Sequence, residues 1–448
     1  MPTPPPNILY LHCHDAGRYV QPHGHPVPTP SLQRLAEEGV LFRQAFTPNP
    51  TCSPSRACLL TGQYAHVNGM LGLAHRGWKL NDYSHHLIHS LHDAGYTSAL
   101  AGMQHIAKGQ GVEPGPTIGY HRTLTLDPHF DAPTDAAIDF LHEDHDRPFF
   151  LALGYFAPHR GNVPHRPTQS FPALGPARDE RYVQPPPTLP DTPETRRDFA
   201  EYTASMQSTD LCFGRVLEAL DRTGLADNTL VIATTDHGVA FPHMKCRLTD
   251  YGTGVMLILR GPRRGFFRGG KVVDAMVSHL DVFPTVCELA GVEPPDRLHG
   301  KSLRPLVTGE ADALHDQLFA EVNHHAAYEP MRAVRSDRHK YIRHFEDHGR
   351  PVLPNCDDGP SKTHLVARGW DRTALPREEL YDLTLDPTEA RNLADDPAHA
   401  ATRDDLRARL DRWMSDTDDP LLQGPIPLPA GGVTTDPAAY SPDGSPAP

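Results

Sequence analysis

The sequence has no long apolar run, few cysteines and fewer basic than acidic residues, and each of these argues against a class of protein or partner. Its 448 residues include no apolar run of the length that a membrane-spanning helix needs. Its seven cysteines form no CxxC pair and are odd in number, which argues against a disulfide framework. Asp and Glu (56) outnumber Lys and Arg (42), so the net charge is −14. Nucleic acids and anionic membranes bind basic surfaces, and we expect neither as a partner.

The chain is long enough for one large α/β domain with a smaller appendage. Its hydrophobic content of 38% is typical of a globular protein. The first residues carry neither the basic region nor the long apolar region of a secretion signal. We therefore expect a cytoplasmic protein, and the sequence leaves a homo-oligomer open.

Strand-like and helix-like segments alternate along the first two thirds of the chain. Short apolar runs predict strands, and amphipathic segments predict helices between them. The strands are expected at 7–13, 97–102, 148–156, 229–236 and 255–259, and the helices at 30–40, 84–95, 135–142, 198–223 and 278–290. Such alternation predicts a large, mostly parallel sheet with helices on both faces.

The character of the sequence changes near residue 331, where charged, short-stranded segments begin and lead to a terminal helix at 402–414. Beyond residue 419 the chain is rich in Pro, Gly and Ala, which indicates a strap or a loose tail. We expect a catalytic domain over 1–325, a small α+β subdomain over 326–420 and a tail over 421–448.

A short segment around Cys52 has the features of an anion site. Pro54 suits the first turn of a helix, Ser53 is the expected N-cap and Gly62 the expected stop. Cys52 then lies at a helix N-terminus, where unpaired N–H groups and the helix dipole favour an anion. Arg56, four residues on, shares a face with Cys52. This arrangement can hold a tetrahedral anion, although a lone Cys before a helix is more often a core residue.

Polar residues follow four of the predicted strands. His14 and Asp15 follow the first strand, and His105 follows the second. His159 comes after the third strand, and Asp236 with His237 ends the fourth. The carboxyl ends of parallel strands form one edge of a sheet, where α/β proteins place their ligands. These side chains can therefore converge on Cys52.

The segment from Cys52 through Pro54 and Arg56 to Gly62 resembles the signature of type I sulfatases, which belong to the alkaline phosphatase superfamily. The resemblance covers nearly the whole chain and is closest to the heparan N-sulfatase (sulfamidase) branch. It implies an alkaline-phosphatase-like α/β sandwich with a small C-terminal subdomain. It also implies that a formylglycine-generating enzyme oxidises Cys52 to formylglycine, which acts as the nucleophile on a small-molecule or saccharide sulfate ester or sulfamate.

The resemblance also implies roles for the residues at the strand ends. His14, Asp15, Asp236 and His237 match the positions that hold one divalent metal ion, with residue 52 completing the set. Two of these positions have imidazole where the family has oxygen ligands. Among manganese, calcium, zinc and iron, this set therefore leans away from calcium.

The remaining family positions concern the transferred group and the leaving group. Lys245 matches the lysine that touches both, and Arg56 orients the nucleophile. His159 resembles the histidine beside the leaving oxygen, a candidate general acid. His105 matches the histidine assigned to abstraction of the hemiacetal proton.

Met103 departs from the family pattern, because a lysine is expected there. Lys108 or Arg160 could replace the missing cation. Alternatively, the substrate carries less charge, as in the related phosphonate monoester and phosphodiester hydrolases, and His237 fits that relative too. A second alternative is a non-catalytic descendant that binds a metal or a glycan. The long segment 161–193 is where substrate choice is expected to reside.

Overall fold

A large sheet runs through the protein, whose computed structural model describes residues 4–108, 114–163 and 169–445. Its strands are β1 (Asn7–Cys13), β2 (Val40–Phe46), β3 (Thr97–Gly102), β4 (Arg122–Thr125), β5 (Phe149–Gly154), β6 (Thr229–Thr235), β7 (Gly254–Val255), β8 (Leu257–Arg260) and β9 (Lys271–Ser278). Neighbouring strands follow the order β4-β3-β5-β1-β6-β8-β2-β7, and β9 pairs with β2.

Most strands of this sheet are parallel, as the sequence predicted. β4, β3, β5, β1 and β6 all run in the same direction. β8 runs antiparallel to both β6 and β2, whereas β9 is parallel to β2. The carboxyl ends of β1, β3, β5 and β6 therefore meet at one edge, which positions the segments that follow them.

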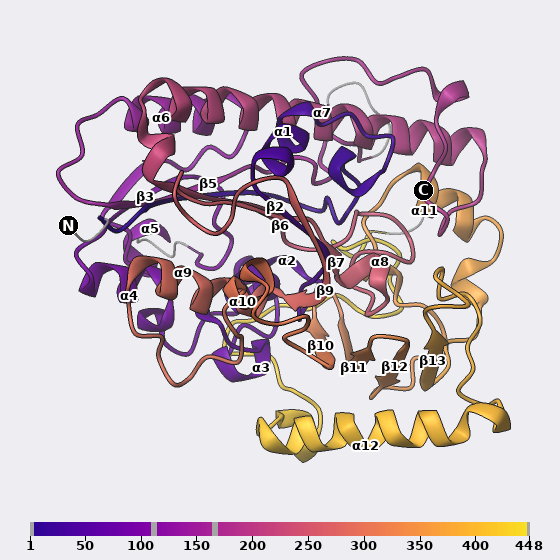
Figure 1. Cartoon of the computed structure of the whole chain (residues 1–448). Coiled ribbons are helices and arrows are strands. Elements are labelled where there is room, and N and C mark those ends of the chain that lie inside the picture. The colour runs from indigo at the N-terminus through magenta and orange to yellow at the C-terminus, as the bar shows by residue number, and fades with distance from the viewer. Residues whose placement is uncertain (1–3, 109–113, 164–168, 446–448) are drawn as a thin grey trace.

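Helices cover both faces of the sheet (Figure 1). One face carries α1 (Pro30–Glu38), α6 (Asp131–Leu141) and α7 (Pro193–Arg222). The other carries α2 (Cys52–Thr61), α3 (Ala65–Asn68), α4 (Leu87–Asp93), α9 (Val282–Ala290) and α10 (Arg304–Thr308). The remaining helices are α5 (Pro114–Ile118), α8 (Asp250–Thr253), α11 (Pro360–Val366) and α12 (Ala400–Asp416).

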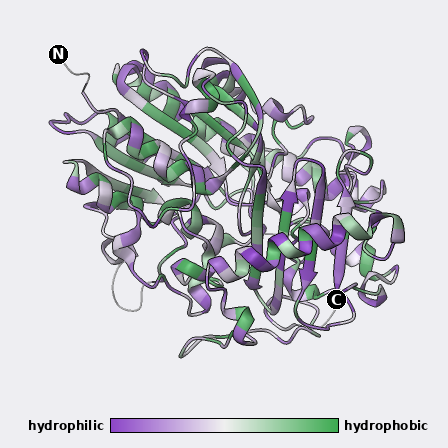
Figure 2. Ribbon diagram, turned by 60° about the horizontal axis from the view of Figure 1, so that its bottom comes forward, coloured by the Kyte–Doolittle hydropathy of each residue, from purple (hydrophilic) through white to green (hydrophobic). Residues whose placement is uncertain are grey.

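Strand β1 explains how one sheet serves two cores. Successive side chains of a strand point to opposite faces. Leu9 and Leu11 pack into the cluster that holds α1, α6 and α7, whereas Ile8 and Tyr10 pack into the cluster on the α2 side. Hydrophobic residues accordingly gather in the interior strands, whereas the helices carry both hydrophobic (green) and hydrophilic (purple) residues (Figure 2). Within the described ranges, none of the helices is both long and apolar enough to cross a membrane.

A smaller antiparallel sheet lies beside the large one and forms the C-terminal subdomain (Figure 1). It consists of β10 (Gln317–His324), β11 (Tyr328–Ser336), β12 (His339–His344) and β13 (Glu378–Asp382), in that order. Helix α12 buries Leu406, Leu410 and Trp413, and the ring of Trp413 stacks on Phe319 of β10 at 4.9 Å. The α/β fold with a small α+β subdomain is thus confirmed.

The end of the chain returns to the large domain. The backbone N–H of Val433 donates to the carbonyl of Arg76 (3.0 Å). The Arg76 guanidinium in turn donates to the carbonyl of Pro442 (2.7 Å). Lys362 Nζ donates to the carbonyl of Tyr440 (2.7 Å). The part of the tail that the structure describes therefore ties the subdomain to the large domain.

A buried ion pair links the small sheet to the chain beyond α12. Arg332 of β11 donates from Nη2 to Oδ1 of Asp419 (2.9 Å), and both side chains are fully buried. Removing one partner leaves an uncompensated charge, so Arg332→Ala should lower the free energy of unfolding by about 4 kcal/mol. Urea denaturation followed by circular dichroism measures this change.

The ion pair between Arg338 and Asp382 (2.7 Å) offers a matched control, because the Arg338 side chain is 56% exposed, although Asp382 is buried. Arg338→Ala should cost less than about 1 kcal/mol. Equal destabilisation by the two substitutions would contradict the importance given to the buried pair.

Candidate active site

Helix α2 places Cys52 in its first turn. The expected N-cap at Ser53 is wrong, since the helix begins at Cys52 and its N-cap is Thr51. Ser53 is the second residue of the helix, and its hydroxyl accepts a hydrogen bond from the backbone N–H of Ala74 (3.0 Å). Gly62 closes the helix in a left-handed conformation, as predicted (φ 66°). All ten side chains of α2 are buried, including that of Cys52.

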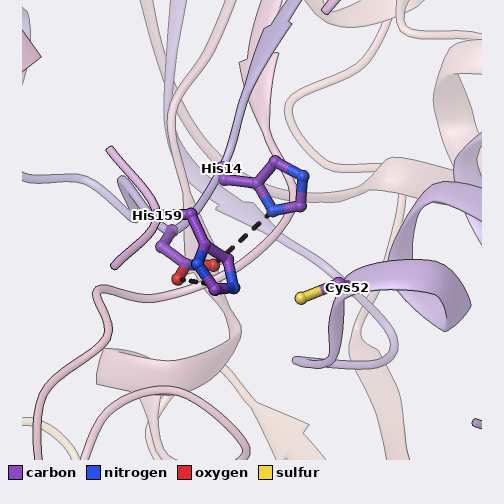
Figure 3. Close-up of side chains that lie close together, drawn as sticks. His14, Cys52 and His159 are labelled. Carbon is purple, nitrogen blue, oxygen red and sulfur yellow. Dashed lines mark ion pairs between the residues drawn. The ribbon is translucent and has the colours of Figure 1, made fainter. Parts of the chain in front are cut away.

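The carboxyl ends of β1 and β6 bring four candidate residues together beside Cys52. The backbone N–H of Asp15 donates to Asp236 Oδ1 (2.8 Å), which locks the two segments to each other. His14 Nδ1 lies 3.1 Å from Asp236 Oδ2. His14, Asp15, Asp236 and His237 are all buried. Figure 3 shows His14, Cys52 and His159 directed toward one common space.

The side chain of His237 is oriented toward this space. Its Nδ1–H donates to the carbonyl of Gly238 (3.0 Å), which leaves the Nε2 lone pair free. Nε2 lies 3.3 Å from Cys52 Sγ and 3.4 Å from Asp15 Oδ1. Burial and the negative charges of Asp15 and Asp236 raise the pKa of Cys52 well above its usual value, and Lys245 opposes this shift only in part.

These donor atoms suit a divalent metal ion. Within the described residues, both ring nitrogens of His14 and Oδ1 of Asp15 are buried without a hydrogen-bond partner. Burial lowers the pKa of His14 well below its usual value, so the imidazole is neutral and can act as a ligand. Potential ligand atoms lie within 4.8 Å of one another in two groups that share Asp15 and Cys52. The groups are His14, Asp15, Cys52 and His159, and Asp15, Cys52, Asp236 and His237.

Arg56 lies under this cluster. Its Nη2 donates to Asp236 Oδ2 (3.0 Å) and to the carbonyl of Cys13 (3.1 Å). Its Nη1 contacts Nδ1 of His12, a buried residue of β1. Burial opposes ionisation of Asp236, but neighbouring positive charge, to which the Arg56 guanidinium contributes, holds the pKa of this carboxyl well below its usual value. Asp236 is therefore a carboxylate at neutral pH.

Lys245 and His159 lie next to each other, near Oδ2 of Asp15. Lys245 Nζ donates to Asp15 Oδ2 (3.0 Å) and lies 3.3 Å from His159 Nε2. Since His159 Nδ1–H donates to the carbonyl of Arg160 (2.6 Å), its Nε2 faces Lys245. Burial alone would lower the pKa of Lys245, but Asp15 and Asp357 raise it well above its usual value.

His105 joins the cluster from the end of β3 in a left-handed backbone conformation (φ 59°). Its ring centroid is 5.6 Å from that of His14. Its Nε2 lies 3.0 Å from Nδ1 of His75, and the two rings stack. Burial and the charge of His75 lower the pKa of His105 well below its usual value.

Among the described residues, neither cation considered for the position of Met103 makes a hydrogen bond or ion pair with the proposed metal ligands. The Arg160 guanidinium is buried and makes a bidentate pair with Asp198 (2.8 Å for each bond). Lys108 Nζ donates to the carbonyl of His75 (3.2 Å). Of the long segment 161–193, residues 164–168 lie outside the described part of the chain.

Sequence reasoning missed three residues of this site. His12 supports Arg56, His75 stacks on His105, and Asp357 Oδ2 lies 2.9 Å from Lys245 Nζ. The position of His12 was detectable, since it sits inside an apolar strand next to the predicted site. Asp357 belongs to an irregular segment of the C-terminal subdomain, and nothing in its local sequence marks it.

A cavity of about 550 Å³ lies next to the cluster, between the segment 243–247 and the C-terminal subdomain. Lys245, Asn355, Cys356, Arg368 and Trp370 are among the residues that line it. Lys245 therefore borders both the cluster and this cavity.

Two family models match the chain. A sulfatase model matches residues 6–292. A model described as the C-terminal region of N-sulphoglucosamine sulphohydrolase matches residues 248–370. Together they cover the large sheet and strands β10, β11 and β12 of the small sheet.

Individual proteins of known identity agree with these models. The chain is 30% identical to N-sulphoglucosamine sulphohydrolase of Homo sapiens, covering 94% of this chain and 92% of the relative. A structure in complex with its substrate D-glucosamine-2-N,6-O-disulfate has a TM-score of 0.68 at 19% identity, with 93% and 99% covered. The phosphonate monoester hydrolase of Agrobacterium radiobacter has a TM-score of 0.66 at 22% identity, with 92% and 96% covered.

Proposed function

The chain belongs to the sulfatase family and is a hydrolase of sulfuric ester or sulfamate bonds, and we propose that formylglycine made from Cys52 is its nucleophile. One observation carries the proposal. The Cys52 thiol lies in the first turn of α2, 3.3 Å from His237 Nε2 and within a cluster of imidazoles and carboxylates. Such a position suits a nucleophile that must face an anion.

The charges around residue 52 fit the binding of a sulfuryl group. Arg56 and Lys245 bring positive charge to opposite sides of the cluster, through Asp236 and Asp15 respectively. We assign Arg56 to orientation of the nucleophile and Lys245 to the sulfuryl oxygens. His159 lies beside Lys245 and its side chain is 20% exposed, so it is the group placed to protonate the leaving atom. His105 is assigned to the hemiacetal proton.

The proposed metal ligands are His14, Asp15, Asp236 and His237, with residue 52. A divalent ion there would lower the pKa of the nucleophile and polarise the sulfuryl oxygens. Neutral imidazole suits manganese, zinc or iron better than calcium, which prefers oxygen ligands.

We propose a sulfated saccharide as the substrate. The human relative is named for N-sulphoglucosamine, and one structural neighbour holds a glucosamine disulfate. A phosphonate monoester or phosphodiester hydrolase is the second candidate, favoured by Met103 in place of a lysine and by a neighbour of that activity.

The test is anion release by the protein co-expressed with a formylglycine-generating enzyme. The panel contains N-sulfoglucosamine, 4-nitrophenyl sulfate and a phenylphosphonate ester at equal concentration. Sulfate release should exceed phosphonate turnover. Dominant phosphonate turnover would favour the second candidate. Absence of both products, with residue 52 still a thiol by peptide mass, would favour a descendant that only binds.

A further inference from the structure

Asp357 enters the site from the C-terminal subdomain. It lies between the short 3-10 helix Leu353–Asn355 and α11. Its Oδ2 is 2.9 Å from Lys245 Nζ, which also lies 3.0 Å from Asp15 Oδ2. The Lys245 ammonium is therefore shared by two carboxylates, of which only Asp15 belongs to the proposed metal set.

The segment that carries Asp357 is held firmly on both sides. Asn355 accepts a hydrogen bond from the backbone N–H of Ala327 (2.8 Å) and donates to Glu329 (2.9 Å). Lys362 Nζ donates to the carbonyls of Cys356 and Tyr440 (2.7 Å each). Such fixation is what a carboxylate needs if it is to recognise a ligand at a defined position.

Asp357 and His159, the proposed acid for the leaving group, are more exposed than the other groups around Lys245. The side chains of Asp15 and Lys245 are 0% and 1% exposed, whereas those of His159 and Asp357 are 20% and 8% exposed. Both side chains also contact the same Lys245 Nζ, His159 through Nε2 at 3.3 Å and Asp357 through Oδ2 at 2.9 Å. The leaving group, which His159 is placed to protonate, then lies next to the Asp357 carboxylate.

A carboxylate is a poor choice for binding sulfate itself. Its charge repels the anion and reduces the attraction that Lys245 offers. It is, however, a strong acceptor for N–H donors. When the S–N bond of a sulfamate breaks, nitrogen keeps the electron pair and takes up a proton, so it becomes a better donor to a nearby carboxylate.

Resting on the proposed function, we infer that Asp357 is a specificity-determining residue that accepts a hydrogen bond from the nitrogen of an amino-sugar leaving group. It favours sulfamates over sulfate esters whose leaving group carries no donor. The charge that it places beside Lys245 weakens the binding of free sulfate, which assists release of that product.

The test compares Asp357→Asn with wild type on N-sulfoglucosamine and on 4-nitrophenyl sulfate. The variant should lose about tenfold or more in kcat/KM for the sulfamate, the effect of removing a charged hydrogen-bond acceptor. Its kcat/KM for the aryl sulfate should stay the same or rise. Inorganic sulfate should inhibit the variant at lower concentration than wild type. Asp358→Asn is the matched control, because Asp358 pairs with Lys362 (2.8 Å) and not with Lys245.

Equal losses on both substrates would overturn the inference, since Asp357 would then only position Lys245. The same holds if Asp358→Asn changes the substrate ratio as much as Asp357→Asn does. Binding of glucosamine, measured by calorimetry, tests Asp357 without turnover and should be weakened about tenfold by Asp357→Asn. Unchanged binding would overturn the inference, whereas wild type inactive on both substrates would count against the proposed function itself.

Discussion

Cys52→Ala is expected to abolish sulfate release, with a loss on the order of 10⁴-fold or more in kcat, because it removes the atom from which the nucleophile is made. The substitution deletes one buried sulfur atom at the start of α2. The helix cap at Gly62 and the contacts of Arg56 with Asp236 do not involve that atom. The melting temperature should therefore change little while activity disappears.

Cys58→Ala provides the matched control on the same helix. Cys58 is fully buried against Ala65 and Leu280, away from the cluster around Asp15. We expect this variant to keep most of its activity, and peptide mass to show residue 52 converted to the aldehyde in wild type and in Cys58→Ala alike. Full activity of Cys52→Ala would remove the basis of the formylglycine mechanism.

The sequence was informative about the site where chemistry follows regular structure. His14, Asp15, Asp236 and His237 each come directly after an apolar strand, so the topology of a parallel sheet is enough to bring them together. The structure does place them side by side. Cys52 was identified by its motif, and its helix position followed from Pro54 and Gly62 with an error of two residues at the cap.

Residues that reach the site through irregular segments were beyond sequence reasoning. Asp357 lies about a hundred residues from Lys245 and is directed to it by hydrogen bonds of Asn355 and Lys362. His75 lies on the short 3-10 helix Ala74–Arg76 and stacks on His105 after β3, and no periodic pattern encodes that contact. The sequence allowed Arg160 to supply the missing cation. It did not indicate that Asp198, which lies on α7, binds the Arg160 guanidinium.

Removal of the divalent ion is expected to have the second largest effect. Dialysis against a chelator should lower sulfate release by about 10³-fold, because the ion supplies several kcal/mol of charge stabilisation. Asp15 and Asp236 would then lack a shared cation, and the melting temperature should fall by about 5 °C as binding free energy is lost. Metal content by mass spectrometry before and after dialysis shows how much ion was removed.

Re-addition of single metals then tests the ligand set. Manganese or zinc should restore both activity and melting temperature at lower concentration than calcium, since His14 and His237 offer imidazole nitrogen where calcium prefers oxygen. Cys52→Ala taken through the same cycle should regain its melting temperature without activity, which separates metal binding from turnover. Calcium restoring the protein best would mean that the two histidines are not ligands. If the chelator changes neither activity nor melting temperature, and no metal is found before dialysis, the cluster works without an ion. Arg56 and Lys245 alone would then have to offset the charge of Asp15 and Asp236.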